Sequence, residues 1–510
     1  MSGKKTIIKS TTVVVLVMLC SRILGFVRQA AIAGVFGSNI STDIYFISNE
    51  FMINVSGAFT AALTTALVTV YIAVAAKDGK KAAGEVASRV LTMFLIMAVV
   101  IVLVLDIFGY QVGGLLAPAY DSQNLESLAH YLRLFSAAFI FSAFQSIYAA
   151  VLNANDSFVP GKLYGLVFNP IAIFSIIFFG DALGLSALVY AYYIANVIQI
   201  LFLHIRCRGL YSFRPSLSLH DPRLLQVGRL ALPILISNVV IQLNGVIDKA
   251  ICSYLGDGVA SAYTYAHSLE QFVTGTFTAT ITLVLLSRFA SIAAENDSEN
   301  MKKTLEKAVS AMIIILTPVA LITILSSEDI VTLVYKRGEF TAEDVTVTAM
   351  ALSGFALGFP LVALREIMVR VHFAYQKTRI PMMISLCAVA LNIALSIVLS
   401  RFVGILGVTV ATSLSAILSI VLLVITSKRY LPEFAFFACR KTMFKCAAAL
   451  LACAGGVVLA EHLFAGVLLR TAMEIVFGCG FYGAALILLR CQELTELFKD
   501  VKNKLRKSGD

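Results

Sequence analysis

Charged residues are scarce in this sequence. Only 14% of its 510 residues are Asp, Glu, Lys or Arg, whereas soluble globular proteins average about 25%. Hydrophobic residues make up 59% of the chain, and the mean hydropathy is +0.89. This composition excludes an ordinary soluble domain. It predicts an all-α polytopic membrane protein with most of its mass in the bilayer.

Catalytic motifs are also missing. The sequence has no Gly-rich Walker loop, no HExxH motif and no GxSxG motif, so we expect no ATP hydrolysis and no other enzymatic activity. Its nine cysteines are scattered and form no CxxC pair, which favours small core residues over metal ligands. We expect no cofactor. Transport would then draw its energy from an ion gradient, the membrane potential or consumption of the product.

Positive charge is unevenly distributed along the chain. Lys and Arg concentrate in the N-terminal tail, in alternate loops and in the C-terminal tail. The other loops contain only Lys336, Arg337, Arg401 and Arg470. This positive-inside pattern predicts that both termini are cytoplasmic. The first apolar run has no small-residue cleavage site, so we expect no cleavable signal peptide.

Long apolar segments predict the helices. A membrane-spanning helix needs about 20 apolar residues. By that measure we predict about 14 spans, at residues 11–36, 43–76, 84–117, 125–153, 158–180, 183–205, 226–255, 259–290, 305–327, 345–375, 380–401, 404–427, 441–462 and 468–490. Segment 329–344 is too short and too charged to span, and it is predicted to be an amphipathic external piece.

The chain partly repeats itself. Four residues of the second predicted span, Gly57, Phe59, Thr60 and Ala61, match Gly275, Phe277, Thr278 and Ala279. The offset covers six spans, so the copies would be parallel repeats about an axis along the membrane normal; chance similarity among apolar helices is the alternative. We therefore predict two pseudo-symmetric six-helix lobes around a central cavity. The predicted divisions are a first lobe at 1–205, an inter-lobe loop at 206–225, a second lobe at 226–428, two additional helices at 429–491 and a basic cytoplasmic tail at 492–510.

The first apolar segment contains two arginines, Arg22 and Arg28. An arginine at the centre of a spanning helix costs roughly 2.5–3.5 kcal/mol on insertion scales, so it normally faces protein or a watery cavity. Gly25 lies between them and could let the helix bend. The next span carries carboxylates and amides, namely Asp43, Asn49, Glu50 and Asn54. These groups predict either a charged, water-filled pocket or a buried salt bridge that only joins two helices.

Several stretches of the sequence are familiar. The opening SRILGFVRQAAIAGVFG with TDIYF, then VLNANDSFVPGKLYGLVFNPIAI, YKRGEFTAED and YQKTRIP, resemble the MurJ (MviN) family of lipid II flippases. The general architecture is shared with polysaccharide flippases and MATE-type exporters. The resemblance implies two six-helix lobes plus two helices in a bacterial inner membrane. It also implies alternating access and a cationic cavity for a pyrophosphate-linked lipid sugar, with membrane lipids and the cell-wall synthesis machinery as neighbours and no nucleic acid.

The resemblance also implies roles for individual residues. Arg22 and Arg28 stand at the family's two essential arginines of the first helix, and Asp43 at its aspartate of the second. Elsewhere this sequence departs from the family. Ser56 and Ser268 stand where the family has arginines, and Ala61 stands near the position of an acidic residue. Two cavity cations are therefore missing, and His267 and Glu270 are the polar groups near the second of these positions.

Some family members carry a sodium site, and sodium would then be the coupling ion. The matching positions are Asp248, Asn392, Ser396, Val408 and Thr412. Asn392 and Ser396 share one helical face. A carboxylate expected near Ser396 is absent, and Asp248 is adjacent to Lys249, which could neutralise it. A hard cation prefers several oxygen ligands, at least one of them charged, so the missing carboxylate counts against the site.

The chemistry of the substrate head assigns the other groups. Arg22 and Arg28 would bind the pyrophosphate through bidentate contacts. Asp43 and Glu50 would pair with these arginines in the empty state, and Asn49 and Asn54 would either bind the sugar or pack between helices. A second cluster contains Arg365, Glu366, Arg370 and His372. There Glu366 and Arg370 are predicted to pair at i, i+4, whereas Arg365 and Glu366 are adjacent and would not share a face; the alternative role is a gate or a second-lobe part of the cavity.

Four functions fit the sequence. The first is a flippase that moves lipid II from the inner to the outer leaflet. The second is a flippase for another undecaprenyl-linked oligosaccharide, because of the missing arginines. The third is a MATE-like cation or drug antiporter, whose cavity would be rich in carboxylates and aromatics. The fourth is a non-transporting scaffold in the cell-wall machinery, which would tolerate loss of Arg22 and Arg28.

Overall fold

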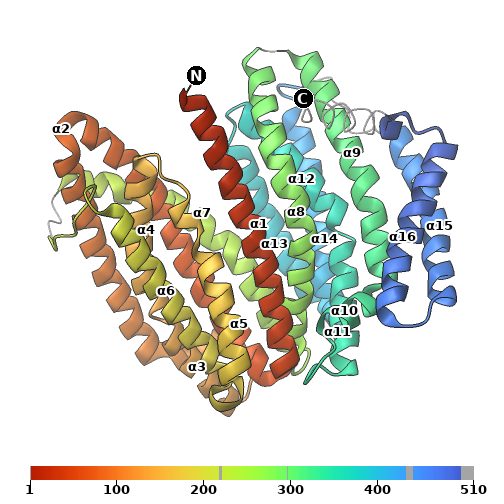
Figure 1. Ribbon diagram of the computed structural model, residues 1–510, viewed down its shortest axis with the longest axis horizontal. Helices are drawn as coiled ribbons and strands as arrows, with labels where there is room; N and C mark the ends of the chain where they lie inside the picture. The colour runs from red at the N-terminus through yellow and green to blue at the C-terminus, as the bar shows by residue number, and fades with distance from the viewer. Residues whose placement is uncertain (1, 217–220, 296, 432–439, 496–510) are drawn as a thin grey trace. The chain divides into compact units, whose positions relative to one another are not determined.

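A computed structural model describes residues 2–216, 221–295, 297–431 and 440–495 (Figure 1). The predicted basic tail therefore lies outside the described residues beyond 495. All regular secondary structure in the described ranges is helical, which confirms the all-α prediction. The sixteen α-helices are α1 Ser2–Phe36, α2 Ile40–Leu116, α3 Ser122–Phe135, α4 Ala138–Ala154, α5 Tyr164–Leu183, α6 Ser186–Cys207, α7 Pro222–Cys252, α8 Val259–Ala294, α9 Ser298–Leu325, α10 Ser327–Tyr335, α11 Ala342–Ala356, α12 Phe359–Ala374, α13 Arg379–Val403, α14 Ile405–Ser427, α15 Arg440–Leu463 and α16 Val467–Leu488.

Every predicted span corresponds to helix, but the count of fourteen is not confirmed. In the described part of the chain, eleven segments are long and apolar enough to cross a membrane, or twelve if the bent pair α11 and α12 forms one span. The predicted spans 43–76 and 84–117 both lie in α2, which is broken at Gly79 (φ 86°, ψ 165°). An L side chain is strained at this φ, so glycine fits the point where the helix is interrupted.

Close contacts divide the chain into two compact units. The first contains Met1–Ser261 together with Arg337–Phe340, and the second contains Ala262–Lys336 and Thr341–Asp510. Helix α7 belongs to the first unit, where it packs against α2. The predicted lobe boundary at 206–225 stays a prediction, because units defined by contacts need not coincide with repeats of the sequence.

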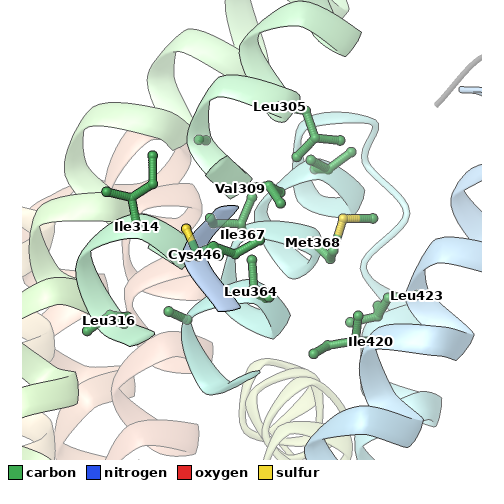
Figure 2. Packing of buried hydrophobic residues seen from close by; sticks show 14 of the residues in the cluster. Leu305, Val309, Ile314, Leu316, Leu364, Ile367, Met368, Ile420, Leu423 and Cys446 are labelled. Carbon is green, nitrogen blue, oxygen red and sulfur yellow. The ribbon is translucent and has the colours of Figure 1, made fainter. Parts of the chain in front are cut away.

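Each unit has its own apolar core. In the first, the two halves of α2 pack with α4 through residues such as Leu67, Leu91 and Val151. In the second, α9, α12 and α14 contribute Val309, Ile367 and other aliphatic side chains, and α15 adds Cys446 (Figure 2). Many large apolar residues instead face outward, which fits helices whose outer surface contacts lipid.

Candidate substrate site

The first unit holds α1 against α5 through small residues. A Cβ on Gly165 would lie 1.7 Å from Oγ of Ser21, so glycine is what permits the close approach. The Nδ2 of Asn169 donates a hydrogen bond of 3.0 Å to the carbonyl oxygen of Ser21. Helix α1 continues through Gly25, whose contribution is close packing against Asn169. These contacts fix the part of α1 that carries both arginines.

Arg22 and Arg28 both have buried donors without a partner. The Nη1 of Arg22 and the Nε of Arg28 are buried, and no described residue accepts a hydrogen bond from either. The guanidinium of Arg28 lies 4.8 Å from the ring centroid of Phe168, a cation–π contact. Leaving a charged donor buried and unpaired costs more than the roughly 1–3 kcal/mol typical of a neutral group. The two side chains are therefore suited to bind an anion.

Asp43 does not pair with these arginines, contrary to the prediction. Its buried carboxylate accepts hydrogen bonds from the backbone N–H groups of Gly258 at 2.8 Å and Ser261 at 2.6 Å. The hydroxyl of Tyr120 approaches the same carboxylate at 3.5 Å. Because α8 begins at Val259, Asp43 caps the positive N-terminal end of that helix. The first N–H groups of α8 have no acceptor within their own helix, which explains why the carboxylate lies there.

The same contact requires glycine at position 258. Gly258 has φ 82°, and a Cβ there would lie 2.5 Å from the carbonyl oxygen of Ser38. The Oγ of Ser38 hydrogen-bonds to the carbonyl oxygen of Gly258 at 2.7 Å. The turn between α1 and α2 is thus held against the turn that precedes α8. We call Ser38, Asp43, Gly258 and Ser261 the latch.

The segment Arg337–Phe340 joins the first unit next to the end of α1. The N–H of Glu339 donates a hydrogen bond of 3.0 Å to the carbonyl oxygen of Gly34. Gly338 has φ 55°, and a Cβ there would lie 2.0 Å from the same oxygen. This part of the predicted external segment 329–344 is therefore a turn that forms a clip on α1, and the preceding part forms the short helix α10.

Glu50 also differs from the prediction, because it pairs with Lys249 of α7. The Lys249 side chain is only 2% exposed and that of Glu50 21% exposed. Lys249 also lies 5.7 Å from the ring centroid of Phe46. A Cβ on Gly245 would lie 2.5 Å from Oε1 of Glu50, so the small residue makes room for the carboxylate. Lys249, rather than an α1 arginine, therefore compensates Glu50.

The amides of α2 remain compatible with either predicted role. Asn49 and Asn54 are both half-buried. Within the described ranges, neither side chain makes a hydrogen bond. Ser56, near which the resemblance places a family arginine, is buried and hydrogen-bonds to the carbonyl oxygen of Ile53 at 3.2 Å. The binding role of the two asparagines stays a prediction.

The polar residues of the second unit form short-range pairs. His267 and Glu270 of α8 lie 3.2 Å apart. In α12 Glu366 contacts Arg370 at 3.2 Å, as predicted, but it also contacts Arg365 at 3.2 Å. Arg365 and Glu366 were predicted not to share a helical face, yet their side chains meet because the long arginine side chain reaches around the helix. Both arginines are thereby tied to one carboxylate.

The residues suggested for sodium fall in both units. In the second, Nδ2 of Asn392 donates to Oγ1 of Thr412 at 3.2 Å, and Oδ1 of Asn392 is buried without a partner among the described residues. Ser396 and Val408 are buried as well. In the first unit Asn244 donates to Asp248 at 3.4 Å. The orphaned oxygen of Asn392 fits an oxygen-liganded cation, although the described residues contain no cluster of three or more His, Cys, Asp or Glu.

Comparison with known proteins decides the family. The family model described as lipid II flippase MurJ matches residues 32–477. The chain belongs to the MurJ lipid II flippase family. It is a multi-pass protein of the bacterial inner membrane. Arg22 and Arg28 precede the matched residues, so their correspondence to the MurJ arginines depends on the opening motif.

Relatives cover nearly the whole length of this MurJ-family chain. The probable lipid II flippase MurJ of Thermotoga maritima is 27% identical over 494 residues, which is 96% of this chain and 98% of the relative. That of Rickettsia prowazekii is 25% identical over 415 residues, 81% of this chain and 82% of the relative. The Thermotoga match includes nearly all helices described above.

Solved structures agree on the fold. A lipid II flippase MurJ in an inward closed conformation superposes with TM-score 0.81 at 22% identity, over 94% of this chain and 99% of the other. An inward-facing MATE family multidrug transporter of the MOP superfamily superposes with TM-score 0.67 at 15% identity, over 82% and 96%. The fold is therefore shared by two transporter classes and does not by itself identify the substrate.

Proposed function

We propose that this chain moves lipid II from the inner to the outer leaflet of the bacterial membrane by alternating access. The family supplies the substrate class, and the buried, unpartnered donors of Arg22 and Arg28 are the observation that carries the proposal. A pyrophosphate head cannot cross about 30 Å of hydrocarbon without replacement of its hydration. Two planar guanidinium groups can replace it through charge-assisted, bidentate hydrogen bonds.

Other residues of the first unit have supporting roles in this proposal. Asn49 and Asn54 are half-buried and would hydrogen-bond the sugar or the peptide. Asp43, within the latch, would hold one end of the unit closed while the head group is bound. Glu50 would keep Lys249 out of the substrate site. The positive-inside pattern of the loops supports a latch on the outer side and both termini in the cytoplasm.

The test is complementation of a bacterium depleted of its own lipid II flippase. Wild-type protein should restore growth, whereas Arg22→Ala and Arg28→Ala should not, at equal abundance in the membrane. Arg133→Ala removes an exposed cation of α3 and serves as the matched control that should still rescue. Arg28→Lys keeps the charge but loses the fork, so we expect at least about tenfold slower lipid II translocation than in the wild type.

Two results would redirect the assignment. Growth rescued fully by the double variant Arg22→Ala/Arg28→Ala would reject the proposed head-group site. Failure of the wild type, combined with rescue of a strain lacking a flippase for another undecaprenyl-linked oligosaccharide, would favour that second substrate. The serines at 56 and 268, where the family has arginines, are the observation that keeps this alternative in view.

We further propose sodium as the coupling ion, with Asn392, Ser396, the Val408 carbonyl and Thr412 of the second unit as oxygen ligands. Replacing sodium by potassium should slow lipid II translocation in proteoliposomes, and Asn392→Ala should remove this dependence on sodium. The unpartnered Oδ1 of Asn392 supports the choice of residue. Equal rates in sodium and potassium would exclude the site.

A further inference from the structure

A basic cavity lies in the first unit, on residues that the flippase proposal does not use. Its volume is about 480 Å³.

 The cavity is lined on one side by α2 between Lys80 and Arg89. On the other side it is lined by the loop that follows α6, between Gly209 and Ser216.

Hydrogen bonds hold the two walls together. The Oγ of Ser88 bonds to the hydroxyl of the buried Tyr211 at 3.3 Å and accepts a bond from the N–H of Arg214 at 3.3 Å. The N–H of Ser216 donates to Oγ1 of Thr92, also at 3.3 Å. The wall on α2 starts directly after the break at Gly79. The loop is therefore pinned to the helix at three points.

The lining carries an excess of positive charge. Lys80, Lys81, Arg89 and Arg214 face one carboxylate, Glu85. Lys80, Lys81 and Arg214 are exposed, and none of them forms an ion pair with a described residue. An anion that entered the cavity would therefore meet cations that have no competing partner in the described chain.

Arg89 is held in place and still has a donor to offer. Its guanidinium bonds to Asp221, and it lies 3.9 Å from Glu85. Burial alone would raise the pKa of Asp221, but hydrogen bonds from the N–H of Arg223 and from Arg89 outweigh it and lower the pKa. Asp221 is thus charged at neutral pH and orients Arg89. The Nε of Arg89 is buried and has no acceptor among the described residues.

We propose that this cavity binds a phosphate group, either of an anionic lipid headgroup or of a soluble phosphate ester. Its volume lies within the roughly 300–1,000 Å³ typical of small-ligand sites. The cations supply charge-assisted hydrogen bonds, and the unpartnered Nε of Arg89 marks where an acceptor is missing. The positive-inside pattern places the cavity on the cytoplasmic side, where both sources of phosphate occur.

The experiment measures binding to the full-length protein in a neutral detergent. The probes are inorganic phosphate and short-chain phosphatidylglycerol, with short-chain phosphatidylcholine as the zwitterionic comparison. The pocket variant is Lys80→Ser/Lys81→Ser/Arg214→Ser. The control variant, Lys77→Ser/Lys428→Ser/Arg429→Ser, removes the same charge from exposed residues that do not line the cavity.

We expect at least one anionic probe to bind the wild type, and the pocket variant to bind it at least about tenfold more weakly. The control variant should stay within about twofold of the wild type. Binding of phosphatidylglycerol alone would identify a lipid as the source, and binding of inorganic phosphate would identify a soluble ester. No anion binding, unchanged binding by the pocket variant, or equal weakening in both variants would overturn the proposal. Thermal unfolding without probe checks that all three proteins are folded.

Discussion

Single charged residues in this chain are placed by partners that lie far away in the sequence. Glu50 meets Lys249, and Asp43 meets the N–H groups of Gly258 and Ser261. A buried carboxylate is stable only where a cation or several donors compensate it. Arg22 and Arg28 have buried donors that no described residue satisfies, and this difference separates the proposed substrate groups from the structural ones.

The pair Glu50 and Lys249 gives a prediction at this scale. Lys249→Met leaves a largely buried carboxylate without its cation, and Glu50→Gln leaves a buried ammonium without its anion. Each should lower the free energy of unfolding by about 3–5 kcal/mol. The double variant Glu50→Gln/Lys249→Met should recover most of that loss, as measured by thermal unfolding of the purified protein. A double variant that is less stable than either single variant would contradict the view that Glu50 and Lys249 compensate each other's charge.

The sequence predicted the pair Glu366 and Arg370 from helical spacing. It also singled out Arg22, Arg28 and Asp43 as charged residues in an apolar context, although the predicted pairing of Asp43 with the arginines was wrong. It did not reveal that Glu50 pairs with Lys249, since nothing in a single sequence places α2 against α7. The pattern that could have helped is the lone Lys249 inside an apolar helix, which requires a carboxylate somewhere in the fold.

At the scale of elements, helices approach one another where glycine leaves room. In the second unit, α15 and α16 pack at Gly456, where a Cβ would lie 2.7 Å from the carbonyl oxygen of Phe477. The neighbouring Gly455 is exposed and has no atom within 4 Å of such a Cβ. Close packing through small residues is the usual way in which helices associate within lipid.

These adjacent glycines form a matched pair of variants. Gly456→Ala should destabilise the protein by about 1–3 kcal/mol, because the methyl group meets backbone that has to move. Gly455→Ala should be neutral, or stabilising by up to about 1 kcal/mol, because alanine favours helix. Thermal unfolding in detergent compares the two. Equal destabilisation by both variants would contradict the close approach of α15 and α16.

The positions of the helices were predictable because hydropathy over about 20 residues is a strong signal. The interruptions were harder to predict. The break in α2 at Gly79 and the 41° bend between α11 and α12 arise from backbone geometry that apolar runs do not encode. The short helix α10 was predicted only as an amphipathic segment, since its charges disguised its helical period.

At the scale of the whole molecule, the fold alone leaves two transporter classes open. Both a MurJ and a MATE structure superpose on the chain. The match to the MurJ family and the cationic residues of α1 favour the flippase, because a drug antiporter would concentrate carboxylates in its cavity. Function therefore follows from particular side chains set on a common scaffold.

The orientation in the membrane is the prediction at this scale. A reporter domain that is active only in the cytoplasm should give a signal when it is fused to the N-terminus, to the C-terminus or within the loop that contains Gly209. A reporter that is active only outside the cytoplasm should give a signal when it is inserted at Gly184, because this turn has no basic residue. No reporter is inserted at Arg133, because an insertion at that residue would interrupt helix α3. A cytoplasmic signal from the Gly184 fusion would contradict the assigned orientation.

The clip on α1 has a consequence for biogenesis. The N–H of Glu339 donates a hydrogen bond to the carbonyl oxygen of Gly34. Glu339 is nevertheless synthesised long after Gly34. The first helix consequently enters the bilayer before its last partner exists. A chain that ended before residue 337 would lack this hydrogen bond, so the order of translation delays completion of the first unit until the part of the second unit at Ala262–Lys336 has been made.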